Sequence, residues 1–173
     1  RKESSAASDV YKRQVLNSGV DGIYCSLDAA TAETFQKIRG GDFNKALNGF
    51  KRLIKRKKEL GLTKPSLAIS YVVMQENIDE LNDFVRLASE LEVGVGFWSL
   101  KESNAFYGTN KELFNLNTWK REKENWTFNY KEQLLKNTPE IANEKLFEAI
   151  ELARELNVSL SLIHISEPTR LGM

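Results

Sequence analysis

The chain has 173 residues, of which 41% are hydrophobic and 28% are charged, and this composition is ordinary for one globular domain. The net charge of +1 gives no reason to expect a nucleic acid or an acidic membrane as a partner. One cysteine excludes a disulfide framework and no apolar run is long enough to span a bilayer, so we expect a reducing, cytoplasmic environment.

The two ends of the chain differ from the sequence between them. Residues 4–14 show no apolar periodicity, residues 162–173 pass from a strand pattern into Ser-Glu-Pro-Thr, and both resemble translated sequencing-adapter sequence. We therefore expect a foreign or disordered segment at 1–14, a folded domain at 15–161 and a second foreign segment at 162–173. The folded domain is then expected to be an internal piece of a longer protein.

The first predicted strand runs from Ile23 to Asp28, after a helix that Gly19 ends. Alternation places Ser26 and Asp28 on one face of this strand, and Cys25 on the other face as an inert small hydrophobe. Polar groups at the end of a buried strand indicate a site beyond the carboxyl end of a sheet. A purely local role, in which Asp28 caps the loop, is an equally good interpretation.

The segments after this strand alternate between helical and extended patterns. They predict a helix at 31–38 capped by Thr31, a helix with an apolar stripe over 43–54, a strand at 67–74, a helix with a stripe over 81–91 and a strand at 93–100. The strand at 67–74 is nearly all apolar, as is typical of a parallel sheet covered on both faces. This order predicts an α/β fold with three parallel strands and crossover helices.

Residues 101–140 interrupt the alternation. The stretch is polar but carries seven aromatic residues, at positions 106, 107, 114, 119, 126, 128 and 130. A long segment at the carboxyl end of a strand is more often a functional lid than a passive loop. Its aromatic side chains could bind a substrate or anchor the lid, and we favour anchoring because they show no base-stacking pattern. A helix at 143–156 and a strand beginning at 158–161 follow.

Three motifs occur in a fixed order: Ser-Leu-Asp at 26–28, Arg-Gly at 39–40 and Glu-Asn at 76–77. In the order and spacing of these motifs, from about residue 15 to 99 and more weakly to about 160, the chain resembles the second half of a radical S-adenosylmethionine (SAM) enzyme. The similarity is greatest to the branch with a C-terminal auxiliary iron–sulfur cluster domain. It implies an incomplete (β/α) barrel of the radical SAM type, with a long loop, a further helix and a further strand after the three parallel strands.

The resemblance also implies an activity. Radical SAM enzymes use a reduced [4Fe–4S] cluster to cleave SAM to methionine and a 5′-deoxyadenosyl radical, here acting on an unknown small-molecule or peptide substrate and supplied by an electron donor. Their cluster is bound by a Cys-x-x-x-Cys-x-x-Cys loop after the first strand, and this chain contains no such loop. We therefore expect the cluster ligands to lie upstream in the parent protein, and this chain alone to be inactive.

Four residues are candidates for contacts with SAM. Ser26 can donate to and accept from ribose hydroxyls, and Asp28 could accept from a ribose hydroxyl or fix the loop of Ser26. Arg39 could pair with the SAM carboxylate or be a solvated cation at a helix end. Asn77 could contact the adenine edge or cap the helix that begins at Ile78, and capping is the simpler interpretation. No residue is assigned as a metal ligand or as catalytic.

Two other classes of function stay open. A (β/α) barrel enzyme without SAM would carry a Schiff-base lysine or a His, Asp and Glu metal set at its strand ends, and none of the three predicted strands supplies one. A non-catalytic docking module would use the aromatic segment as its interface. A Cys-x-x-x-Cys-x-x-Cys loop upstream would favour the radical SAM enzyme over both.

Overall fold

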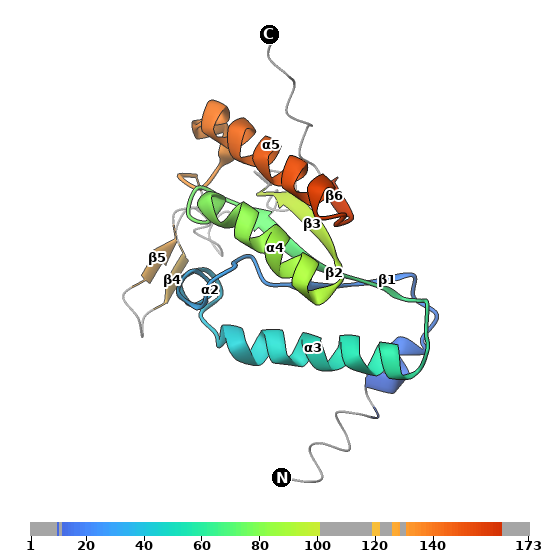
Figure 1. The fold of residues 1–173 in the computed structure, drawn as a ribbon. Helices are drawn as coiled ribbons and strands as arrows, with labels where there is room; N and C mark the ends of the chain where they lie inside the picture. Colours follow the sequence, from blue (N-terminus) through green and yellow to red (C-terminus); the bar gives the residue numbers. More distant parts are fainter. Residues whose placement is uncertain (1–9, 11, 101–118, 122–125, 129–130, 164–173) are drawn as a thin grey trace, which may run out of the picture.

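The computed structural model describes residues 10, 12–100, 119–121, 126–128 and 131–163. Its main body is a four-stranded sheet with helices against one face (Figure 1). The strands are β1 (Gly22–Ser26), β2 (Ser66–Val73), β3 (Gly94–Ser99) and β6 (Leu160–Ile163), in the spatial order β1-β2-β3-β6. All three pairings are parallel. The predicted α/β class and the order of the first three strands are confirmed, and β6 lies beside β3.

The longer helices pack on the sheet through apolar stripes, including those that the sequence predicts at 43–54 and 81–91. They are α2 (Ala32–Arg39), α3 (Phe43–Glu59), α4 (Leu81–Leu91) and α5 (Pro139–Glu155). All four stripe positions of α3 are buried, at Phe43, Leu47, Phe50 and Ile54. Alternate residues of β2 are buried with them in the same core, namely Leu67, Ile69, Tyr71 and Val73. The core therefore lies between one sheet face and the helices, and the opposite face of the sheet carries no helix among the described residues.

The short helix α2 is fixed at both ends. Thr31 is its N-cap, with Oγ1 accepting from the backbone N of Thr34 at 3.3 Å, as predicted. Gly40 ends the helix in the left-handed conformation, with a φ of +63°, which glycine adopts without steric cost. These caps place the start of α2 directly after the turn that follows β1.

Several boundaries differ from the predicted ones. β1 ends at Ser26 rather than at Asp28, because Asp28 has a left-handed φ of +57° that an extended strand does not allow. Helix α5 begins at Pro139, four residues earlier than predicted, since proline is favoured in the first helical turn. Residues 12–16 are helical with Leu16 buried, and β6 continues to Ile163.

The stretch at 101–140 contains more regular structure than the sequence predicts. Two short strands, β4 (Trp119–Arg121) and β5 (Trp126–Phe128), pair antiparallel, and a 3-10 turn, η2 (Leu135–Asn137), precedes α5. The predicted role of this stretch as a lid anchored by aromatic side chains lies outside the described residues.

Candidate functional site

The turn after β1 holds a buried carboxylate against β2. Asp28 is 4% exposed, and its Oδ1 accepts from the backbone N of Val72 at 2.8 Å. Its Oδ2 forms an ion pair with Nη2 of Arg39 at 2.7 Å. The side chain of Asp28 therefore turns toward the neighbouring strand. The predicted alternation does not extend to Asp28, because β1 ends at Ser26 and Asp28 has a left-handed φ.

Burial also changes the protonation behaviour of this carboxylate. It raises the pKa of Asp28, and the hydrogen bond from Val72 and the charge of Arg39 offset only part of that effect. Arg39 is the last residue of α2 and its side chain is 40% exposed, so it is a partly solvated cation at a helix end that also pairs with Asp28.

Asn77 connects the turn after β1 to the turn after β2. It is 1% exposed, and its Nδ2 donates to the carbonyls of Asp28 and Val72, each at 2.9 Å. Its Oδ1 accepts from the backbone N of Met74 at 2.8 Å. Asn77 occupies the N-cap position of the following 3-10 turn η1 (Ile78–Glu80), as predicted, but its side chain makes no capping hydrogen bond. Contact between Asn77 and adenine stays a prediction, and it would require one of these bonds to open.

Ser26 lies on the helix-free face of the sheet. Its residue is exposed, and its Oγ is 3.0 Å from Oγ of Ser70, which is buried in β2. The strand register continues this row through Gly96 to Ser161, so small residues cross the whole sheet at this level. The row offers hydroxyl groups to anything that occupies the helix-free face.

An aromatic pair borders the row. The rings of Tyr24 and Trp98 meet edge to face with centroids 6.5 Å apart. A Cβ at Gly96 would lie 3.1 Å from Cε1 of Tyr24 and 3.3 Å from Nε1 of Trp98, so the glycine leaves room for both rings beside it. The sequence analysis singled out neither this pair nor Ser70.

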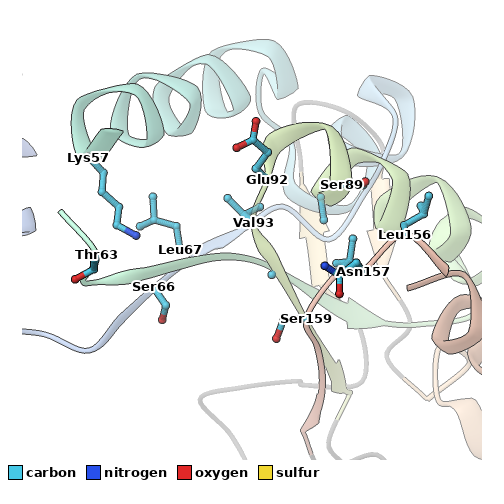
Figure 2. A pocket seen from close by; sticks show the side chains of 13 residues that line it. Lys57, Thr63, Ser66, Leu67, Ser89, Glu92, Val93, Leu156, Asn157 and Ser159 are labelled. Atoms are coloured by element: carbon cyan, nitrogen blue, oxygen red, sulfur yellow. The ribbon is translucent and has the colours of Figure 1, made fainter. Parts of the chain in front are cut away.

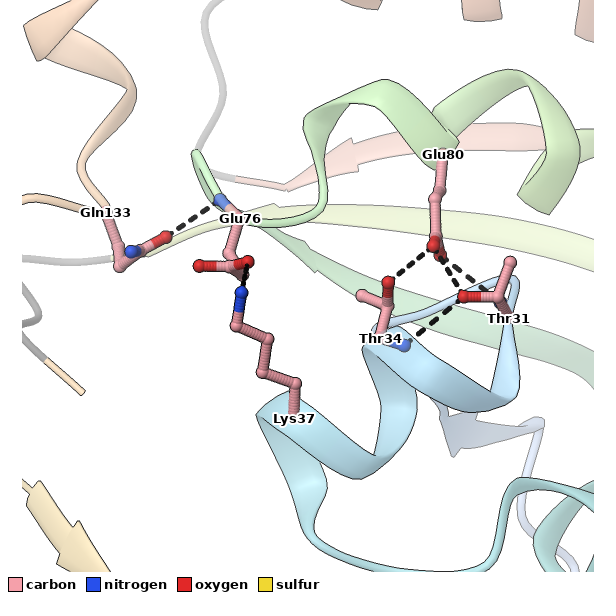
Figure 3. A network of polar contacts seen from close by, with 6 residues as sticks. All are labelled: Thr31, Thr34, Lys37, Glu76, Glu80 and Gln133. Atoms are coloured by element: carbon pink, nitrogen blue, oxygen red, sulfur yellow. Dashed lines mark hydrogen bonds and ion pairs between the residues drawn. The ribbon is translucent and has the colours of Figure 1, made fainter. Parts of the chain in front are cut away.

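A second carboxylate, which the sequence analysis also missed, crosses between the two turns. Oε2 of Glu80 accepts from the backbone N of Ala30 at 2.7 Å and of Thr31 at 3.2 Å. Its Oε1 accepts from Oγ1 of Thr31 at 2.6 Å and of Thr34 at 2.5 Å (Figure 3). Burial alone would raise the pKa of Glu80, but the four hydrogen bonds to the ionised carboxylate have the larger effect, so the net pKa is lowered.

The sequence signal for Glu80 is weak. It follows Asn77 by three residues, a spacing that resembles a capping box and would predict a bond back to its own helix start. The carboxylate instead reaches a loop 46 to 50 residues earlier in the chain.

The turn after β2 is held by two further contacts. Glu76 forms an ion pair with Lys37 of α2 (Figure 3), and its backbone N donates to Oε1 of Gln133 at 2.8 Å. The backbone N of Gln75 donates to the carbonyl of Gln133 at 3.2 Å. This turn is therefore tied to α2 on one side and to the segment before α5 on the other.

Comparison of the chain with protein-family models, with curated proteins and with solved structures gave no match in any of the three. Within the ranges that the structure describes, no group of three or more His, Cys, Asp or Glu side chains could hold a metal ion. No helix in those ranges is long and apolar enough to cross a membrane. The chemistry offered at this edge of the sheet is that of hydroxyls, carboxylates, a carboxamide and a guanidinium.

The four predicted site residues fall into two groups. Asp28, Arg39 and Asn77 are directly connected, through the ion pair and through the carbonyl of Asp28. Ser26 precedes Asp28 by two residues but presents its hydroxyl to the helix-free face, next to Ser70. Contact of any of the four with SAM stays a prediction.

A hollow at the opposite, amino edge of the sheet involves none of these residues. It is an open depression of about 480 Å³ between the ends of α3, α4 and α5 and the starts of β2 and β3 (Figure 2). Its lining is mixed, with Lys57, Ser66, Ser89, Glu92 and Asn157 among the polar members. The predicted site and this hollow therefore lie at different ends of the same strands.

Proposed function

We propose that the chain is part of a radical SAM enzyme, and that the carboxyl edge of its sheet contacts the ribose and adenine portion of SAM. One observation carries the proposal: each of the three motifs contributes one residue, Asp28, Arg39 or Asn77, to a connected group that lies after two adjacent parallel strands. Ligands of open α/β sheets bind beyond the carboxyl ends of the strands. In the proposed architecture, an incomplete (β/α) barrel, the helix-free face is the lumen.

The donor groups suit a nucleoside that carries a carboxylate. The hydroxyls of Ser26 and Ser70 can exchange their mutual hydrogen bond for bonds with ribose hydroxyls, because each group both donates and accepts. Arg39 is partly exposed, so further guanidinium N–H groups are open to a ligand carboxylate. In this proposal Asp28 and Asn77 hold the turn, since both are buried and already hydrogen-bonded.

The described residues do not fit an iron–sulfur cluster. The one thiol, Cys25, packs against the core on the helix side of β1, and burial raises its pKa, whereas cluster ligands are thiolates. In the proposed enzyme the three cysteines belong to another segment, and this chain binds and orients the nucleoside of SAM. A small-molecule or peptide substrate, an electron donor and a cytoplasmic location complete the proposal.

A barrel enzyme that works without SAM is less well supported. The described strands β1, β2 and β3 end at Ser26, Val73 and Ser99, so none of them ends in a lysine that could form a Schiff base. A coding sequence upstream of Val15 that contains Cys-x-x-x-Cys-x-x-Cys would support the radical SAM enzyme, and an upstream barrel half without it would contradict the proposal.

Equilibrium binding of SAM to this chain tests the proposal directly. Ser26→Ala should weaken binding by roughly twofold to tenfold, since one hydroxyl contact contributes about 0.5–1.5 kcal/mol. Cys25→Ala is the matched control, because the adjacent side chain packs toward the helices and should leave affinity unchanged. Failure of the wild-type chain to bind SAM, or equal affinity of Ser26→Ala and wild type, would contradict the assignment.

A further inference from the structure

We propose that Glu80 is a positioning residue for the candidate SAM site, and that its carboxylate holds the turn after β1 in the conformation that presents Ser26 and buries Asp28. The inference rests on the proposed function, because SAM is the ligand for which the turn is positioned. Its own evidence is the set of contacts that Glu80 makes to a different loop (Figure 3).

The contacts of Glu80 restrain the start of α2. The N–H groups of Ala30 and Thr31 lie at the beginning of the helix, where backbone donors have no intrahelical acceptor. A carboxylate at this position satisfies both donors and also complements the positive end of the helix dipole. With the bonds from the hydroxyls of Thr31 and Thr34, residues 30–34 are fixed to the residue that precedes α4.

The restraint reaches the site through a short, buried connection. Leu27 and Asp28 both donate their backbone N–H to the carbonyl of Ser70, at 3.1 and 3.4 Å, and Ala29 is fully buried. Asp28 therefore lies between the carbonyl of Ser70 and the residues that Glu80 binds. Its φ of +57° is a strained conformation for a residue other than glycine, and it persists only where the surrounding contacts enforce it. Glu80 supplies the enforcing contacts on the side of the turn that leads into α2.

The four donors match a carboxylate best. Two amides and two hydroxyls point at one side chain, and an ionised carboxylate is an acceptor at both oxygens. A glutamine at position 80 keeps one oxygen for the amides, and its NH₂ can donate to the hydroxyls once they rotate. Glu80→Gln should therefore retain much of the restraint, whereas Glu80→Ala removes all of it.

The test compares Glu80→Ala, Glu80→Gln and wild type. The matched control is Glu90→Ala, at an exposed position of α4, the helix that Glu80 precedes. SAM affinity and amide hydrogen exchange are measured on the folded proteins. In Glu80→Ala we expect SAM binding weaker by roughly threefold to tenfold. We also expect faster exchange at Leu27 and Asp28, whose amides do not contact Glu80. Glu80→Gln should keep most of the wild-type SAM affinity and most of the protection from exchange, and Glu90→Ala should match wild type in both measurements.

Each outcome separates the two proposals. Wild-type affinity together with wild-type exchange at Leu27 and Asp28 in Glu80→Ala would overturn the positioning role. Absence of SAM binding in the wild-type chain would overturn the proposed function, and the exchange rates would still decide whether Glu80 fixes the turn. If Glu80→Ala does not fold, Glu80→Gln decides by the same readouts, with a smaller expected loss of affinity.

Discussion

The two ends of the parallel sheet are stabilised in different ways. At the carboxyl edge, the side chains of Asp28 and Asn77 join the turn after β1 to β2 through buried or half-buried hydrogen bonds. Glu80 joins the same turn to the segment after β2 (Figure 3). At the amino edge, the ion pairs Lys64–Asp21 and Lys58–Glu92 lie on the exposed surface. Glu92 also lines the open depression there (Figure 2). The polar contacts of the carboxyl edge are therefore largely buried, whereas those of the amino edge are exposed to solvent.

This difference has an energetic meaning. Among the described residues the buried polar side chains are Asp28, Ser70 and Asn77, and they lie in the turn after β1, in the second half of β2 or directly after it. A buried polar group is costly when it has no partner, and each of these three side chains has at least one hydrogen-bond partner. Exposed ion pairs contribute little to stability and do not fix a geometry to the same degree.

Asn77→Ala should be the most destabilising of the substitutions considered. It leaves the backbone groups of Met74, Val72 and Asp28 without their side-chain partner, and we expect a loss of roughly 2–4 kcal/mol in the free energy of unfolding. Urea denaturation measures this loss. Asn82→Ala is the control, because that amide makes one 3.4 Å contact with an exposed glutamate and should change stability by about 0.5 kcal/mol or less. Equal losses in the two variants would remove the special status of the carboxyl edge.

Asp28→Asn should have a smaller effect that depends on pH. Because burial raises the folded-state pKa of Asp28, the folded protein binds a proton there more readily than the unfolded chain. The stabilisation from this group is present below its unfolded pKa and is lost as pH rises through the folded pKa. The stability of wild type minus that of Asp28→Asn should therefore fall as pH rises from acidic to neutral. A difference that rises with pH would contradict this assignment.

Glu80→Gln should show the opposite pH dependence. Hydrogen bonds hold the pKa of Glu80 below its usual value despite partial burial, so its stabilisation is present above the unfolded pKa and is lost as pH falls through the folded pKa. The stability of wild type minus that of Glu80→Gln should shrink in acid. Denaturant midpoints measured across the acidic range give the pH dependence of both stability differences. If the difference for Asp28→Asn and the difference for Glu80→Gln change in the same direction with pH, the two carboxylates do not have opposite pKa shifts.

Asp21→Asn at the amino edge should have the weakest effect. The partner of Asp21 is Lys64 at 2.7 Å, and both side chains are largely exposed, so the free energy of unfolding should change by about 0.5 kcal/mol or less. The small difference between wild type and Asp21→Asn should disappear when salt is added, because salt screens an exposed ion pair. A loss as large as that of Asn77→Ala would erase the contrast between the two edges.

The sequence predicts the layers of this fold better than its loops. The helix stripes and the apolar β2 report burial directly, so the core positions of α3 and α4 are found from periodicity. The orientation of Asp28 is missed because a single left-handed residue breaks the alternation without a sequence signal. The bond from Asn77 to Asp28 and the bonds of Glu80 are missed because the turn after β1 lies more than 40 residues earlier in the chain, beyond the reach of any local pattern.

The most direct test of the central claim, that the carboxyl edge is the nucleoside site, is a titration of the ¹⁵N-labelled chain with SAM, followed through its amide resonances. The account predicts saturable shifts at residues 26–31 and at Arg39, while Gly94 and Ser159 beside the amino-edge depression stay unchanged. Shifts confined to the amino edge, or none at any SAM concentration, would contradict it.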